Sequence, residues 1–194
     1  MSNTSIEADK KRFIDLCGEI NRSGMDDLMF WLENSDFYTA PASTRFHCAY
    51  TGGLLKHSLN VYEELVRLLK AYPEIDVPNE SVIIASLFHD LCKVDFYTVE
   101  QRFRKDEGGQ WEKYNTFGID EKFCYGGHGS KSVFLLERFI RLTTQEAMAI
   151  HNHMGAWEDG AKRYAGAAYE YDNFAWLVHV ADEAATYIRE SEED

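Results

Sequence analysis

The sequence predicts a mainly α-helical protein with one β-hairpin inserted between its helices. Apolar residues recur at helical spacing over most of the chain, and only three prolines interrupt it. Between residues 96 and 117 this spacing gives way to two runs rich in aromatic and β-branched residues, which flank an Asp-Glu-Gly-Gly segment at 106–109. We therefore expect a helical bundle with a hairpin insert around residues 96–117.

The first third of the chain divides into helices on either side of one loop. Residues 5–21 and 25–34 carry apolar side chains at helical spacing and predict two amphipathic helices. Residues 35–47 show little periodicity and contain Pro41, so we expect an ordered loop there. Residues 53–72 have an apolar stripe at a spacing of about 3.6 residues, which predicts a helix with one buried face.

Cap signals and apolar runs define the elements that follow. The Pro-Asn-Glu-Ser segment at 78–81 offers capping residues for a helix that starts with the apolar run 82–91. Helical periodicity returns after the hairpin in three segments. These are residues 130–141, residues 144–153 with Thr143 or Thr144 as the cap, and residues 174–189.

Length and hydrophobic content indicate one domain, and the net charge limits what the protein can bind. A chain of 194 residues, 45% of them hydrophobic, can bury one sizeable core. We expect one domain over residues 1–194, with N-terminal helices (1–39), a core (40–190) containing the hairpin insert (94–126), and a solvated acidic tail (190–194). The formal net charge of −13 excludes a general binder of nucleic acid or of membrane surfaces, because such binders need a basic surface.

The cysteines and the apolar runs indicate a cytoplasmic protein. The four cysteines, at 17, 48, 92 and 124, form no C-x-x-C pair, and we expect reduced thiols. The N-terminus has no secretory pattern. No apolar run approaches the roughly 20 residues that a membrane-spanning helix needs.

Histidine and aspartate side chains occur inside the apolar helices. His57 lies within the 53–72 stripe, His89 and Asp90 follow the apolar run from 82, and Asp182 lies in the last helix. A buried carboxylate needs a metal, a cation or several hydrogen-bond donors. Imidazole nitrogen and carboxylate oxygen are standard ligands of divalent transition metals, so a bundle that gathers these residues would hold an ion.

Four segments in order resemble the HD superfamily of metal-dependent phosphohydrolases. The similarity is closest to the HD domain of bacterial 3′-to-5′ exoribonucleases and to related stand-alone HD proteins, and it covers about residues 40–190. The four segments are Phe-His-Cys-Ala-Tyr-Thr-Gly-Gly-Leu-Leu-Lys-His at 46–57, His-Asp-Leu-Cys-Lys at 89–93, Gly-His-Gly-Ser-Lys-Ser at 127–132 and Ala-Ile-His-Asn-His-Met-Gly at 149–155. The resemblance implies an HD-type helical bundle.

The resemblance also implies the metal ligands. The residues that match the ligands of a first ion are His57, His89, Asp90 and Asp182, whereas His128 and His153 match the residues that complete a second ion bridged by Asp90. One or two divalent ions are expected, of Mn, Fe, Mg, Ni or Zn. This chain departs from the family at Cys92, where glycine is usual, at Cys48, where a histidine is frequent, and at Met154, which bears on the second ion. Cysteine near the site could alter metal preference.

The remaining site residues are expected to handle the phosphate and the substrate. Asp90 would bridge or orient the attacking water, and Lys93 is either a phosphate contact or a cation at a helix C-terminus. Arg45 and His47 are expected near the pocket, although each could also be an ordinary loop residue. Trp111 and Tyr114 are expected to stack on a nucleobase if the hairpin lies over the metal pocket; otherwise the aromatic residues of the hairpin form a small separate cluster.

Together these features predict a metal-dependent phosphohydrolase that acts on a nucleotide or a related small phosphorylated substrate. Short single-stranded nucleic acid is a less favoured substrate, because the chain has no basic stripe. The alternatives are an HD-type two-iron oxygenase, which would need redox-active iron, and a non-catalytic nucleotide-binding regulatory module. The sequence leaves the substrate, the metal and the oligomeric state open.

Overall fold

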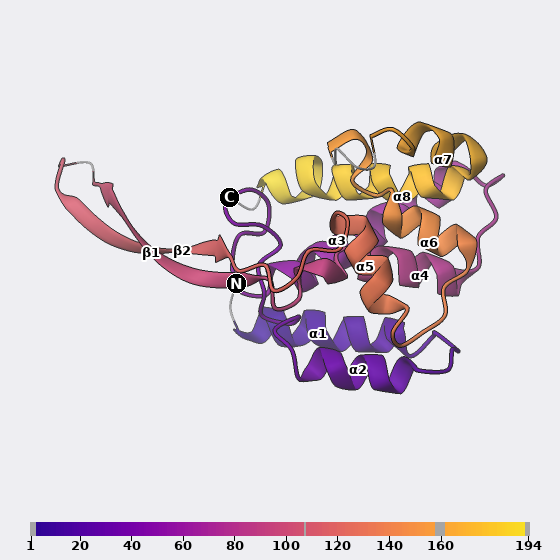
Figure 1. Ribbon diagram of the computed structural model, residues 1–194, viewed down its shortest axis with the longest axis horizontal. Helices are drawn as coiled ribbons and strands as arrows, with labels where there is room; N and C mark the ends of the chain where they lie inside the picture. Colours follow the sequence, from indigo (N-terminus) through magenta and orange to yellow (C-terminus); the bar gives the residue numbers. More distant parts are fainter. Residues whose placement is uncertain (1–2, 107, 158–161, 193–194) are drawn as a thin grey trace.

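The computed structural model describes residues 3–106, 108–157 and 162–192, and it is mainly helical (Figure 1). The α-helices are α1 (Asn3–Cys17), α2 (Met25–Glu33), α3 (Gly53–Ala71), α4 (Asn79–Phe88), α5 (His128–Leu136), α6 (Thr144–His151), α7 (Ala165–Tyr171) and α8 (Asn173–Ala184). Strands β1 (Tyr97–Lys105) and β2 (Trp111–Ile119) form the hairpin. The predicted combination of a helical bundle and one hairpin is therefore confirmed.

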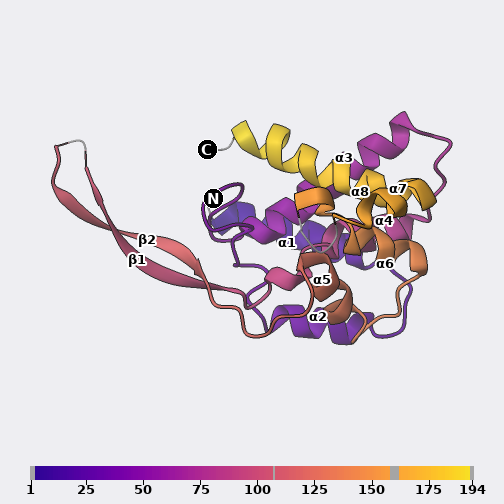
Figure 2. The same cartoon turned by 45° about the horizontal axis from the view of Figure 1, so that its top comes forward.

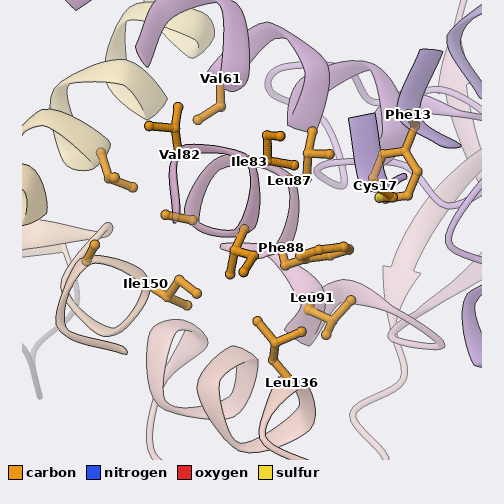
Figure 3. Packing of buried hydrophobic residues seen from close by; sticks show 14 of the residues in the cluster. Phe13, Cys17, Val61, Val82, Ile83, Leu87, Phe88, Leu91, Leu136 and Ile150 are labelled. Atoms are coloured by element: carbon orange, nitrogen blue, oxygen red, sulfur yellow. The ribbon is translucent and has the colours of Figure 1, made fainter. Parts of the chain in front are cut away.

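Helix α4 is the centre of the bundle. Its residues from Ser81 to Phe88 are all buried, as expected for a helix that is apolar on every side. It packs against α3 and α6, and α8 in turn packs against α3 and α6. Figure 3 shows Val82, Ile83 and Phe88 of α4 within this core, with Val61 of α3 and Ile150 of α6 around them.

The two N-terminal helices cover one side of the bundle (Figures 1 and 2). Phe13 of α1 is fully buried and lies in edge contact with Tyr38 and Phe88, at ring-centroid distances of 5.8 Å. Helix α2 begins after Gly24, whose φ of 93° favours glycine. A Cβ at Gly24 would lie 1.9 Å from the carbonyl oxygen of Phe139, so glycine also permits the close approach of these two segments.

Several helix ends differ from the sequence-based expectation. Helix α5 ends at Leu136, five residues before the expected end at residue 141, and α7 falls in a segment for which no helix was expected. The start of α6 agrees with the sequence. Thr143 caps it, and the Thr143 and Glu146 side chains each accept a hydrogen bond from the other's backbone N–H. After α8 the chain continues as a π-helical turn (Ala185–Arg189) and a 3₁₀ turn (Glu190–Glu192).

The hairpin is antiparallel and runs from a Tyr97–Ile119 pair at its base to a Lys105–Trp111 pair near its tip. Both views show it projecting away from the helices (Figures 1 and 2). Its base is held to the body, since the Tyr97 hydroxyl donates a hydrogen bond to the Ala42 carbonyl. Among the helices of the described ranges, none combines the length and the apolar character needed to cross a bilayer.

Candidate metal centre

Residues far apart in the sequence meet at the centre of the bundle. His57 lies in the second turn of α3, His89 and Asp90 directly follow α4, His153 follows α6, and Asp182 lies near the end of α8. The three histidines are fully buried, and the carboxylates are 2% and 8% exposed. The packing of α3, α4, α6 and α8 therefore places five polar side chains in the interior, where each needs a partner.

The ligand-type atoms of this cluster lie close together. His57 Nε2 is 3.1 Å from Asp182 Oδ1, 3.3 Å from His89 Nε2 and 3.6 Å from Asp90 Oδ2. His89 Nε2 is 3.3 Å from Asp90 Oδ2 and 3.8 Å from Asp182 Oδ1. Two atoms that bind one ion at about 2.0 to 2.2 Å lie roughly 2.8 to 3.6 Å apart at angles between 90° and tetrahedral. Four of these five separations fall in that range.

The other ring nitrogen of each histidine is occupied by an oxygen acceptor. His89 Nδ1 lies 2.8 Å from the Ser86 carbonyl and His153 Nδ1 lies 2.7 Å from the Ile150 carbonyl. His57 Nδ1 lies 3.0 Å from Glu190 Oε1. An oxygen that can only accept requires N–H at Nδ1, so each neutral imidazole directs the Nε2 lone pair towards the cluster. This arrangement of outer oxygen acceptors is typical of metal-binding histidines.

The charges of the cluster favour a cation. Burial works against ionisation of Asp90, but the nearby Lys93 and His89 outweigh it and hold the pKa of Asp90 well below its usual range. Burial likewise opposes a charged His57, yet Glu190 and Asp182 raise the pKa of His57 to about 10. The site thus combines ionised carboxylates with the His57 Nε2 lone pair, which binds a proton when no metal ion is there to take its place. The donor set therefore fits a divalent ion.

Asp90 lies between two groups of ligand-type atoms. Its Oδ2 faces His57 and His89, as described above. Its Oδ1 is 3.5 Å from His153 Nε2 and 4.0 Å from the sulfur of Cys92. The ligand atoms of Asp90, Cys92 and His128 all lie within 4.8 Å of one another. The structure therefore brings together all six residues that the resemblance marks as metal ligands.

Lys93 is a buried cation directly beside this cluster. Its Nζ lies 2.6 Å from Asp90 Oδ2, and the residue is 7% exposed. Burial opposes the charged ammonium, but Asp90 outweighs it and raises the pKa of Lys93 above its usual value. Because Asp90 occupies only one of the three N–H donors, Lys93 can also donate to an oxygen of a bound anion.

A cavity of about 410 Å³ opens from Asp90, Lys93 and Asp182 towards the surface. We call it the central pocket. Its remaining lining residues are Phe46, His47, Met154, Trp157, Glu183, Thr186 and Tyr187. His47 thus reaches the pocket, with its ring 4.7 Å from that of His57, and burial lowers its pKa to about 4. Arg45 lies further out, beside Phe46 in a neighbouring cavity at the base of the hairpin.

The structure places Trp111 and Tyr114 outside the central pocket. Trp111 pairs with Lys105 near the tip of the hairpin and is 68% exposed, and Tyr114 pairs with Arg102. Neither residue lines the central pocket, because the hairpin extends away from the helices (Figure 1). Only the base of the hairpin lies near the site. The aromatic side chains at the pocket mouth are Phe46, Trp157 and Tyr187, which are 65%, 70% and 62% exposed.

Glu190 corrects the expectation of a solvated tail over residues 190–194. It is 2% exposed, and its carboxylate accepts hydrogen bonds from His57 and from the Asn60 side-chain amide. Burial opposes its ionisation, but His57 outweighs it and lowers the pKa of Glu190 to about 2. Residues 193 and 194 lie outside the described ranges. A short acidic run gives no sequence signal for such a role.

A comparison with known proteins identifies one distant relative of known activity. Over 84 residues the chain is 29% identical to the dihydroneopterin 2′,3′-cyclic phosphate phosphodiesterase of Methanocaldococcus jannaschii. This segment makes up 42% of the chain and 31% of the relative. No protein-family model and no solved structure matches the chain. A distant homologue is therefore a phosphodiesterase, which supports a hydrolase, and the buried cluster could hold metal ions.

Proposed function

We propose that the protein is a metal-dependent phosphohydrolase of the HD type that cleaves a phosphoester of a nucleotide or a related small substrate. The observation that carries this proposal is the convergence of His57, His89, Asp90 and Asp182 in the bundle core, where the ligand atoms of the two histidines lie 3.1 to 3.8 Å from each other and from the two carboxylates. In this proposal residues 40–190 form the catalytic core, and residues 1–39 cover it.

Asp90 and Lys93 would have different roles in the hydrolysis of a phosphoester. A bound divalent ion lowers the pKa of water and neutralises charge on phosphoryl oxygens. Asp90 would orient the attacking water through Oδ1 or Oδ2. Lys93, which lines the central pocket, would donate to a phosphoryl oxygen and balance the charge that develops there. This local cation matters because a protein of net charge −13 repels an anionic substrate at long range.

The central pocket supports a substrate with a planar ring. Its volume of about 410 Å³ is in the range of small-molecule sites. Phe46, Trp157 and Tyr187 line its mouth, and aromatic side chains bind bases by stacking without regard to base identity. The relative is named for a cyclic phosphodiester that carries a pterin. We therefore favour a cyclic or linear nucleotide phosphodiester, with short single-stranded nucleic acid second.

The test is a screen of phosphoesters against protein stripped of metal and reconstituted with Mn, Fe, Mg, Ni or Zn. Cyclic and linear nucleotide phosphodiesters should be hydrolysed, and Asp90→Asn should abolish this activity. Turnover that requires redox-active iron and oxygen would instead support an HD-type oxygenase. Nucleotide binding without turnover under every metal would support a regulatory module. Either result would overturn the proposed hydrolase.

A further inference from the structure

A thiol lies beside the outer oxygen of Asp90. The Cys92 sulfur is 3.3 Å from His128 Nδ1 and 4.0 Å from Asp90 Oδ1, and Cys92 is 3% exposed. Its position is fixed, because its backbone N–H donates to the Ser132 hydroxyl at 3.0 Å. Cys92 belongs to the 3₁₀ turn that connects α4 to the hairpin, and His128 is the first residue of α5. The 3₁₀ turn and the start of α5 therefore bring the Cys92 sulfur and His128 Nδ1 together beside Asp90 Oδ1.

An independent feature indicates that a ligand belongs at this point. His153 is fully buried, and its Nε2 has no hydrogen-bond partner among the described residues. This atom faces Asp90 Oδ1 at 3.5 Å, on the same oxygen as the Cys92 sulfur. A buried nitrogen without a hydrogen bond is costly, and a cation that it shares with Asp90 would satisfy it.

The distance between the Cys92 sulfur and His128 Nδ1 is compatible with a hydrogen bond and with a shared metal ion. A thiol that donates to an imidazole would also give a sulfur–nitrogen separation of 3.3 Å. Sulfur at about 2.3 Å and nitrogen at about 2.05 Å from one ion lie roughly 3.1 to 3.6 Å apart, for angles between 90° and tetrahedral. The sulfur–nitrogen separation of 3.3 Å lies inside this range, whereas the 4.0 Å between the sulfur and Asp90 Oδ1 lies above it, so these two side chains must move closer when the ion binds. Asp90 and His153 favour the ion, because a thiol–imidazole hydrogen bond leaves the buried His153 Nε2 with only its 3.5 Å contact to Asp90 Oδ1.

We propose that Cys92 is a thiolate ligand of a second divalent ion, together with Asp90 Oδ1, His128 Nδ1 and His153 Nε2. The inference rests on the proposed metal-dependent function, and it adds sulfur to the second site. As the metal–sulfur bond forms, the thiol proton passes to solvent. Thiolate and imidazole ligands favour zinc, iron or cobalt over magnesium. The second site would therefore select a softer ion than a site of histidine and carboxylate alone.

Cobalt(II) reports this ligand directly, because a thiolate bound to cobalt gives a charge-transfer absorption in the near ultraviolet. Metal-stripped protein would be titrated with cobalt and its absorption spectrum followed. We expect two equivalents to bind per chain, with the sulfur band present. Cys92→Ser and Cys92→Ala should lose the band and weaken binding of one equivalent at least tenfold, while the other equivalent still binds.

A matched thiol variant and a first-site variant complete the experiment. Cys124→Ser removes an exposed thiol near His128 and should keep the band. His57→Ala should lose one equivalent and keep the band, with far-ultraviolet circular dichroism as the check that each variant is folded. Two equivalents without a sulfur band, or a band that survives Cys92→Ala, would overturn the thiolate ligand and leave the hydrolase intact. A chain that binds no cobalt would instead overturn the proposed metal-dependent function.

Discussion

Glu190 accepts a hydrogen bond from His57 at 3.0 Å, across a sequence separation of 133 residues. Both side chains are fully buried. Because a carboxylate only accepts, the proton of this bond lies on His57 Nδ1, and Nε2, which binds either a proton or an ion, points at Asp182 and His89. The last turn of the described chain therefore sets the orientation of a proposed metal ligand in α3.

Glu190→Gln should weaken metal binding without abolishing it. Glutamine keeps the shape of the side chain and loses the charge that favours N–H at Nδ1. Loss of such an outer partner typically costs about 10- to 100-fold in metal affinity. Calorimetric titration of metal-stripped protein measures this affinity, and Glu74→Gln, on the surface, is the matched control. Wild-type affinity in Glu190→Gln would show that Glu190 has no role in positioning His57.

Replacing Asp90 and replacing His153 should deplete different numbers of metal ions. Asp90→Ala should deplete both ions and abolish turnover, because its two oxygens face the two groups of ligands. His153→Ala should spare the ion at His57 and lower occupancy at the second site. Elemental analysis of the purified variants measures both effects. Asp90→Asn guards against a folding defect, since its amide oxygen can still accept a hydrogen bond from Lys93, which Asp90→Ala leaves buried without a partner. Equal depletion in the two variants would contradict two sites that share Asp90.

Trp157 and Trp111 provide a matched pair of exposed tryptophans, at 70% and 68% exposure. Trp157 lies at the mouth of the central pocket, whereas Trp111 is near the tip of the hairpin. Trp157→Ala should lower kcat/KM for a nucleotide substrate about 5- to 150-fold, because stacking on a base is worth roughly 1 to 3 kcal/mol. Trp111→Ala should leave it unchanged. Steady-state kinetics on a nucleotide and on a nitrophenyl phosphate diester separates base recognition from chemistry. Equal losses on both substrates would count against stacking.

Glu146 should make the free energy of unfolding depend on pH. Its fully buried carboxylate accepts bonds from the Arg22 guanidinium, at 2.6 and 2.7 Å, from the Ser81 hydroxyl and from the Thr143 backbone. Burial opposes ionisation, but these donors outweigh it and lower the pKa of Glu146. A lowered folded-state pKa stabilises the fold above the unfolded value, and this contribution is lost as pH falls through the folded pKa.

The measurement is urea unfolding of wild type and Glu146→Gln at several pH values. The wild type should be more stable at pH 7, and the difference should shrink as pH falls below about 4. Arg22→Ala should cost roughly 3 kcal/mol at neutral pH, because it leaves the Glu146 carboxylate buried without its cation. A difference between wild type and Glu146→Gln that does not change with pH would contradict this account.

The cluster could be predicted from the sequence because its members interrupt apolar helices. His89 and Asp90 directly follow a run that is buried on every side, and Asp182 lies in a similar run, so a partner was required for each. The order of these residues then indicated a known pattern. Glu190 gave no such signal, because a glutamate in a short acidic run at the surface has the same local sequence as one that folds back onto a histidine.

The direction of the hairpin could not be predicted either. Its ends lie close to Lys93 and His128, but fixed ends do not determine where a two-stranded ribbon points. Aromatic side chains on a hairpin can lie over a pocket or be exposed to solvent, so their presence in the sequence does not show which way the hairpin points. Phe46 and Trp157, which do line it, lie in segments without periodicity. Their position depends on how the loops pack after the helices have assembled, which short-range patterns do not encode.

The most direct test of the central claim is the metal content of the protein after stripping and reconstitution. Elemental analysis of wild type should find at least one tightly held divalent ion per chain. The single variants His57→Ala, His89→Ala, Asp90→Ala and Asp182→Ala should each lose the first ion while Glu74→Gln retains it. A wild-type protein that takes up no ion from Mn, Fe, Mg, Ni or Zn would contradict the metal centre and the hydrolase built on it.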